Sequence, residues 1–214
     1  MTRSKIILYI DGSNLFGGLS ELLGLGEYIA FPSLLTVIEQ DIQIDVVYFY
    51  ATYMRIDPTK NNAYRVRVMT QKKFFDSAKT LPKVTFYKGH FSGYGKEKGI
   101  DVHLAVDMAV GAATNQYETA IIMTGDADLK YPVEKAREFG KTVHLAAVGS
   151  RFPFGIAPLV SKIIILDIDN FFTKHIISSY RGKLPHFVTH ELRGNVKIKK
   201  ININPAESAG DVPL

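Results

Sequence analysis

Residues 6–10 form an unbroken apolar run, IILYI, and polarity switches abruptly at Asp11 in the turn sequence DGSN. A short continuous run rich in β-branched and aromatic residues, closed by a glycine-containing turn, is typical of a strand buried on both faces. Such strands lie in the middle of parallel sheets, and open α/β sheets bind ligands at the carboxyl ends of their strands. The run therefore predicts a central parallel strand that carries Asp11 to the edge where ligands bind.

The rest of the chain alternates strand-like and helix-like segments. Strands are predicted over residues 44–53, 83–91, 119–124, 142–148 and 162–168, and helices over 14–25, 31–40, 62–79, 102–114 and 132–139. In the helix over 102–114, Val102, Val106 and Val110 recur with Ala105 and Ala109 at the spacing of a buried face. Alternation of this kind predicts an α/β fold with three α/β/α layers and a mainly parallel central sheet.

Charge and pattern both change near residue 173. Residues 1–173 hold 19 Lys and Arg against 18 Asp and Glu, whereas residues 174–214 hold seven against three. We expect one folded domain over 1–173 and a short basic C-terminal extension over 174–214, disordered from about residue 204. Within the extension, residues 186–193 and 196–203 could form a hairpin. The basic arm could contact nucleic acid or pair with a second copy of the chain in a homodimer.

Several classes of protein are disfavoured by composition. No apolar stretch reaches the roughly 18–20 residues that a membrane-spanning helix needs, so we expect no membrane partner. The chain has no cysteine, which excludes disulfides and thiolate metal sites and fits a reducing compartment. The first strand begins too early to leave room for a signal peptide. These features predict a cytoplasmic protein.

Acidic residues gather where predicted strands end. Asp11, Asp126 and Asp128 follow strands directly, and Asp101 opens the helix beyond another strand. Because the carboxyl ends of parallel strands share one edge, these carboxylates would converge, and their mutual repulsion would be relieved by a hard divalent cation, Mg²⁺ or Mn²⁺. Asn14 adds an amide beside them. Each aspartate alone is also typical of a turn or a helix N-cap, an alternative that is strongest for Asp101.

Three motifs occur in order along the chain: YIDGSNL, KGIDVHLAVDMAVGA and TGDADLKYPVEKAREFGKTVHL. Together they resemble the NYN domain family, most closely its bacterial LabA-like branch within the PIN-like nuclease superfamily, over about residues 5–169. The resemblance implies a PIN-like (Rossmann-like) fold and an acidic site that binds Mg²⁺ or Mn²⁺ and cleaves RNA. Carried onto matching positions, it nominates the catalytic residues Asp11, Asn14, Asp101, Asp126 and Asp128.

Phosphodiester hydrolysis by such a site needs metal ligands and groups that hold the substrate. We expect Asp11 and Asp126 to bind metal directly, and Asp101 to bind a second ion or orient the attacking water. Asp128 would be a further metal ligand or a hydrogen-bond acceptor behind the others. Asn14 would orient the scissile phosphate or Asp11.

Substrate contacts are predicted from neutral and basic side chains close to these acids. Ser13 lies in the first turn, and Lys96 and Lys98 lie in the glycine-rich loop SGYGKEKG, where their ammonium groups could hold phosphates. Single-stranded RNA is the expected partner.

Three other functions are weighed against this one. An aspartyl-nucleophile phosphatase needs a second aspartate at position 13, which is Ser13, and an integrin-type metal site needs a serine at position 15, which is leucine. Both are disfavoured by these mismatches. The third is a non-catalytic RNA-binding or regulatory module that keeps the acidic pocket, since fold resemblance alone does not establish activity.

Overall fold

The computed structural model describes residues 4–40, 42–91, 97–169, 171–177, 189–193 and 198–200. In chain order, its elements are β1 (Ile6–Asp11), α1 (Gly12–Leu22), β2 (Glu27–Ile29), α2 (Phe31–Ile38), β3 (Val46–Ala51), α3 (Asn62–Ala78), β4 (Val84–Lys88), β5 (His90–Phe91), β6 (Glu97–Lys98), α4 (Ile100–Ala113), β7 (Thr119–Met123), the 3₁₀ turn η1 (Ala127–Leu129), α5 (Lys130–Glu138), β8 (Thr142–Val148), the 3₁₀ turns η2 (Gly149–Arg151) and η3 (Ala157–Leu159), β9 (Lys162–Asp169), β10 (Phe171–Ile177), β11 (Thr189–Arg193) and β12 (Ile198–Lys200).

The central sheet has the strand order β11-β10-β9-β8-β7-β1-β3-β4. The six strands from β9 to β4 are parallel to one another, and β10 and β11 continue the sheet in antiparallel fashion. All six strands predicted from the sequence are therefore present, with β1 in the interior of the sheet. Because β1 lies between β3 and β7, the chain order reverses direction beside it, which is where open α/β sheets bind ligands.

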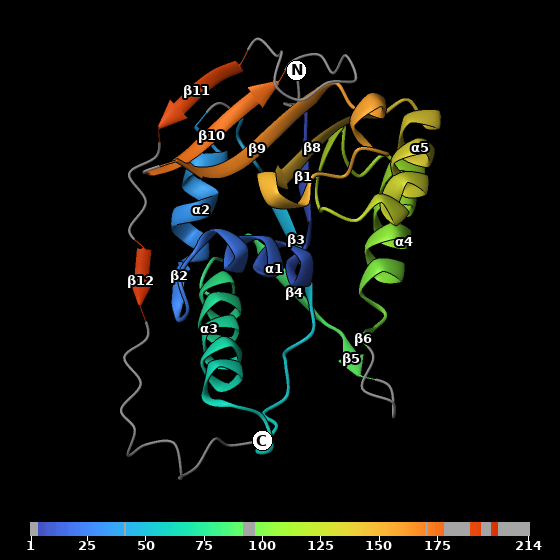
Figure 1. Cartoon of the computed structure of the whole chain (residues 1–214). Coiled ribbons are helices and arrows are strands. Elements are labelled where there is room, and N and C mark those ends of the chain that lie inside the picture. Colours follow the sequence, from blue (N-terminus) through green and yellow to red (C-terminus); the bar gives the residue numbers. More distant parts are fainter. Residues whose placement is uncertain are drawn as a thin grey trace.

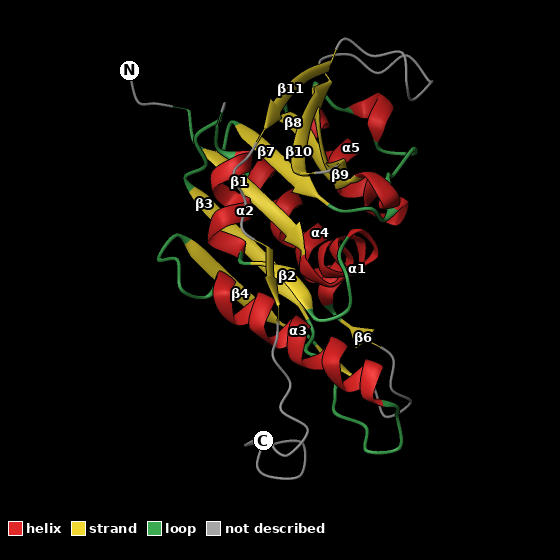
Figure 2. Cartoon of the chain, turned by 60° about the vertical axis from the view of Figure 1, so that its left-hand side comes forward, coloured by secondary structure: helices red, strands yellow, loops and turns green. Residues whose placement is uncertain are grey.

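Helices cover both faces of the sheet. Figure 1 shows α1, α2 and α3 on one side and α4 and α5 on the other, and Figure 2 shows the first three in front of the strands. Leu8 and Ile10 of β1 join the apolar cluster with α1, α2 and α3, whereas Ile7 and Tyr9 join the cluster with α4 and α5. All four side chains are fully buried. The predicted three-layer α/β/α fold is confirmed.

The buried face of α4 differs from the prediction. Val102, Val106 and Val110, expected inside, are 64%, 52% and 49% exposed, and the side chains that pack inside are those of Ile100, Leu104, Met108 and Ala112. The helix is apolar on almost every face, so helical periodicity could not separate its inner stripe from its outer one. The larger Leu, Met and Ile side chains occupy the core, and the valines lie at the surface.

The predicted C-terminal hairpin is wrong. β11 pairs with β10, and β12 pairs with β2 near the start of the chain, so residues 189–193 and 198–200, the described parts of the two segments, do not pair with each other. Strand partners are chosen by tertiary packing, which a local pattern does not reveal. The sheet also continues across position 173, because β10 pairs with β9 along its whole length. The boundary proposed there stays a prediction, and the predicted disorder of residues 204–214 lies outside the described residues.

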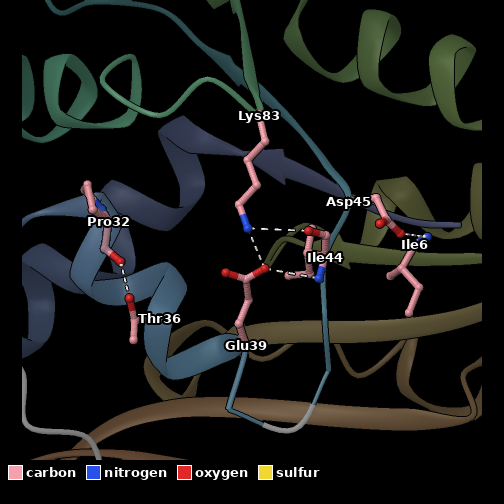
Figure 3. A network of polar contacts seen from close by, with 7 residues as sticks. All are labelled: Ile6, Pro32, Thr36, Glu39, Ile44, Asp45 and Lys83. Atoms are coloured by element: carbon pink, nitrogen blue, oxygen red, sulfur yellow. Dashed lines mark hydrogen bonds and ion pairs between the residues drawn. The ribbon is translucent and has the colours of Figure 1, made fainter.

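A polar network aligns the starts of three strands at the sheet's amino edge (Figure 3). One carboxylate oxygen of Glu39 accepts both the Lys83 ammonium, at 2.5 Å, and the backbone N–H of Ile44, at 3.1 Å. The first residue of β1, Ile6, donates its N–H to the Asp45 carboxylate at 2.8 Å. These bonds fix β1, β3 and β4 relative to one another, so their carboxyl ends reach the opposite edge in register.

Within the described part of the chain, no helix combines the length and the apolar character that crossing a membrane requires.

Candidate active site

Most of the residues singled out from the sequence surround one cavity of about 330 Å³. It lies where β1 passes into α1, β6 into α4, β7 into η1 and β8 into η2. Its lining comprises Asp11, Ser13, Asn14, Lys98, Gly99, Ile100, Asp101, Asp126 and Arg151. Segments more than a hundred residues apart in sequence thus share one polar cavity, as expected for the carboxyl edge of a parallel sheet.

Asp11 is the most buried of the acids, with only 5% of its surface exposed. It is the N-cap of α1: its Oδ1 accepts the backbone N–H of Asn14 at 2.9 Å. Its Oδ2 accepts the hydroxyl of Thr124 at 3.3 Å. Asp11 therefore does cap a helix, which is the alternative role that the sequence suggested for these aspartates. It is compatible with ligand binding, because each carboxylate oxygen can accept more than one bond and the helix N-terminus favours a negative charge there.

Thr124 connects the first carboxylate to the second. Its buried hydroxyl, which donates to Asp11, also accepts the backbone N–H of Asp126 at 2.9 Å. Asp126 in turn caps η1, since its Oδ1 accepts the N–H of Asp128 at 2.9 Å. One hydroxyl thereby fixes the spacing of the two aspartates that the sequence nominates as metal ligands.

Asn14 joins the same two segments from the other side. Its Oδ1 accepts the backbone N–H of Gly125 at 2.9 Å, so the amide orientation is set and the Nδ2 amino group remains as a donor at the cavity. A Cβ on Gly125 would lie 2.8 Å from that Oδ1 and 2.7 Å from the Cβ of Arg151. Only a glycine at this position allows the two neighbours to approach the turn so closely.

Asp101 reaches the cavity from the first turn of α4, one residue inside the helix. The N-cap is Gly99, so the capping alternative for Asp101 is wrong. Lys98, at the end of β6, also lines the cavity, as does Ser13, whose hydroxyl accepts the N–H of Thr52 at 3.4 Å. Lys96 lies outside the described residues.

Asp128 is not part of the cavity lining. Its side chain is exposed, and its contact with Asp126 is made by its backbone N–H. Conversely, Arg151 lines the cavity and Thr124 connects two of its aspartates, although neither residue was predicted from the sequence. Both follow or end parallel strands, so a search of those strand ends for cations and hydroxyls, as well as acids, could have found them.

The donor set suits a hard divalent cation. Asp11, Asp101 and Asp126 offer carboxylate oxygens, and Ser13 offers a hydroxyl. Across the described ranges, however, no three acidic or histidine side chains lie close enough to hold a metal ion by themselves. This arrangement fits Mg²⁺, which is commonly held by one or two carboxylates and completed by water and substrate phosphate oxygens rather than by an all-protein cage.

The comparisons with known proteins agree with this fold. The model of the NYN domain family matches residues 5–162, and no curated protein matches the chain. The chain is similar to the crystal structure of a Vibrio parahaemolyticus protein of unknown function: the TM-score is 0.58 and the identity 18%, over 79% of this chain and 96% of that one. A KaiC-like protein from Pyrococcus horikoshii aligns with a TM-score of 0.29 and 10% identity over 94% of this chain and 87% of that one, too low to carry an argument. The Vibrio structure shows the same fold.

Proposed function

Because the chain belongs to the NYN domain family, a family of PIN-like nucleases, we propose that it is a metal-dependent ribonuclease that hydrolyses phosphodiester bonds of single-stranded RNA. The observation that supports this most is the meeting of three aspartates from three separate elements, β1, η1's N-cap and α4, around one cavity. A single strand-end aspartate is an ordinary turn residue, but three on one cavity offer carboxylate oxygens from which one or two can bind a divalent cation.

In this proposal Asp11 and Asp126 hold the metal ion, Mg²⁺ or Mn²⁺. The bonds from Asn14, Thr124 and Asp128 keep their carboxylates in place, leaving further lone pairs for the ion. When bound, the ion supplies Lewis-acid stabilisation of the negative charge that develops on the phosphate. Asp101, exposed on the first turn of α4, orients the attacking water and accepts its proton.

The substrate would be held by the remaining polar groups of the cavity. Lys98 offers an ammonium for a phosphate, and Asn14 offers its Nδ2 amino group, which has no protein partner in the part of the chain described. Ser13 offers its hydroxyl. The cavity is lined mainly by polar groups, as contact with a nucleic-acid backbone requires.

The test is cleavage of a 5′-labelled single-stranded RNA in Mg²⁺, Mn²⁺ or EDTA by the wild type, Asp11→Asn, Asp101→Asn and Asp126→Asn. We expect metal-dependent cleavage that is lost in Asp11→Asn and Asp126→Asn and reduced about 10²-fold in Asp101→Asn, the usual effect of losing a general base. Asp57→Asn is the matched control: it makes the same chemical change in an exposed turn outside the cavity, and its activity should equal that of the wild type.

Asp128→Asn tests whether the carboxylate of Asp128, and not only its backbone N–H, contributes to cleavage. If only its backbone N–H contributes, the variant retains cleavage; a loss as large as that of Asp126→Asn would make its carboxylate a ligand. Folding of every variant is checked by circular dichroism. An absence of cleavage in all metals, with RNA binding retained, would favour the non-catalytic RNA-binding module instead.

A further inference from the structure

Arg151 lines the cavity, and its side chain is held by contacts at its base and at its tip. At its base, its Cβ packs against Gly125, where an added Cβ would come within 2.7 Å of it. At its tip, the guanidinium rests on the backbone of α1 at Gly17, where an added Cβ would lie 2.6 Å from Cζ. Two glycines on different segments therefore leave room for one arginine side chain, and Arg151 is among the residues that line the cavity with the aspartates.

Among the described residues the guanidinium makes one ion pair, and that pair uses only part of its donors. Nε donates to Oε1 of Glu21 at 2.9 Å, and Nη2 donates to the same oxygen at 2.5 Å. A guanidinium has five N–H donors. The side edge, Nε with Nη2, is thus bonded to Glu21. The end edge, Nη1 with Nη2, has no acceptor among the described residues.

This geometry leaves a fork of donors suited to a phosphate. Two parallel N–H groups match two phosphate oxygens, and arginine stays charged at every relevant pH. The side chain is one-third exposed, so it is reachable from solvent yet restrained on both sides. The hydrogen bond from Arg151 lowers the pKa of Glu21, which therefore remains a carboxylate near neutral pH. Glu21 consequently keeps the fork pointed in one direction.

We infer that Arg151 binds a backbone phosphate of the nucleic acid next to the one held at the aspartates, and that Glu21 positions Arg151 for this contact. The inference rests on the proposed function, because it needs a nucleic acid in the cavity. The contact itself is a direct ion pair between guanidinium and phosphate, so it does not depend on a metal ion.

The experiment measures binding of a fluorescein-labelled single-stranded RNA by anisotropy in EDTA, over a range of NaCl concentrations, for wild type, Arg151→Gln and Arg151→Lys. We expect Arg151→Gln to weaken binding about tenfold or more and to lower the slope of log Kd against log salt by about 0.7, the value for one phosphate contact on a single strand. Arg151→Lys keeps the charge and loses the fork, so its slope is unchanged although its affinity falls. The control is Arg137→Gln, the same charge change on an exposed position of α5.

Variants of Glu21 distinguish a positioning role for this residue from a simple effect of its negative charge. By charge alone, removing a carboxylate near the cavity would tighten RNA binding. If Glu21 positions Arg151, Glu21→Ala instead weakens binding, whereas Glu21→Gln, which keeps the accepting oxygen, restores it to at least the wild-type affinity. Tighter binding by Glu21→Ala would overturn the positioning role.

Equal affinity and equal salt slope for Arg151→Gln and wild type would overturn the inference while leaving the proposed function in place. So would an absence of RNA binding in EDTA. The function itself is decided separately, by metal-dependent cleavage in the wild type and its loss in the aspartate variants.

Discussion

The side-chain oxygen of Asn14 accepts the backbone N–H of Gly125 across 111 positions of sequence, at 2.9 Å. This bond joins the first turn of α1 to the turn after β7, and it holds the two loops that carry Asp11 and Asp126. The hydroxyl of Thr124 makes a second connection between the same two aspartates. The spacing of the candidate metal ligands is therefore set by neutral groups, which do not change with pH.

Replacing Gly125 should damage the site more than the fold. In Gly125→Ala, the new Cβ meets Asn14 and Arg151, so the turn must shift, at a cost of about 1–3 kcal/mol for overpacking. We expect cleavage to fall sharply while the circular dichroism spectrum stays native. Gly155→Ala is the control, because its Cβ would lie at an ordinary 3.6 Å from Ala127. Thermal unfolding and cleavage measured on both variants check this, and equal losses would contradict it.

Thr124→Val and Thr124→Ser test the hydroxyl. Valine has nearly the same shape as threonine but leaves the N–H of Asp126 without its partner. Losing such a bond lowers the free energy of unfolding by about 1–3 kcal/mol. We expect the lower value because Asp126 is only half-buried. Serine keeps both bonds. We expect cleavage to be lost in the valine variant and largely retained in the serine variant. If both variants lose cleavage equally, the methyl group rather than the hydroxyl matters.

The tyrosines predict how the protein behaves in alkali. Burial raises the pKa of Tyr9, of Tyr117 and, with help from its 2.7 Å bond to Asp107, of Tyr50. A raised folded-state pKa stabilises the fold fully below the unfolded value of about 10, and this stabilisation is lost as pH rises above it. In an absorbance titration of the 11 tyrosines, these should ionise only as the fold is lost. If these three tyrosines ionised at about pH 10 while the protein stayed folded, the conclusion that burial raises their pKa would be wrong.

The two faces of α4 make a matched pair. Met108 is fully buried, so Met108→Ala should lower the free energy of unfolding by about 2–5 kcal/mol. Val106 is 52% exposed, so Val106→Ala should change it by no more than about 0.5 kcal/mol. Denaturant unfolding of both variants distinguishes the observed face from the one that the sequence periodicity indicated.

This helix also shows what sequence reasoning could reach. The positions of the parallel strands were predictable because their apolar runs are short and end in polar turns, and this in turn placed Asp11 and Asp126 at one edge. The inner face of α4 could not be predicted, because the helix has apolar residues along two faces and the sequence does not show which of them is buried. Arg151 was not predicted because its position depends on contacts with Gly17 and Glu21. Those contacts form only when η2 packs against α1.

The interior position of β1 has a consequence for how the protein is made. β1 is synthesised before both of its neighbours, and one of them, β7, follows it by more than a hundred residues. Contacts so distant in sequence form slowly, and an unpaired apolar strand is prone to aggregation until they do. Asp11 and Asp126 therefore meet only after every residue between them has been synthesised. Through all of that time a growing polypeptide carries the first half of its candidate site before the second half exists.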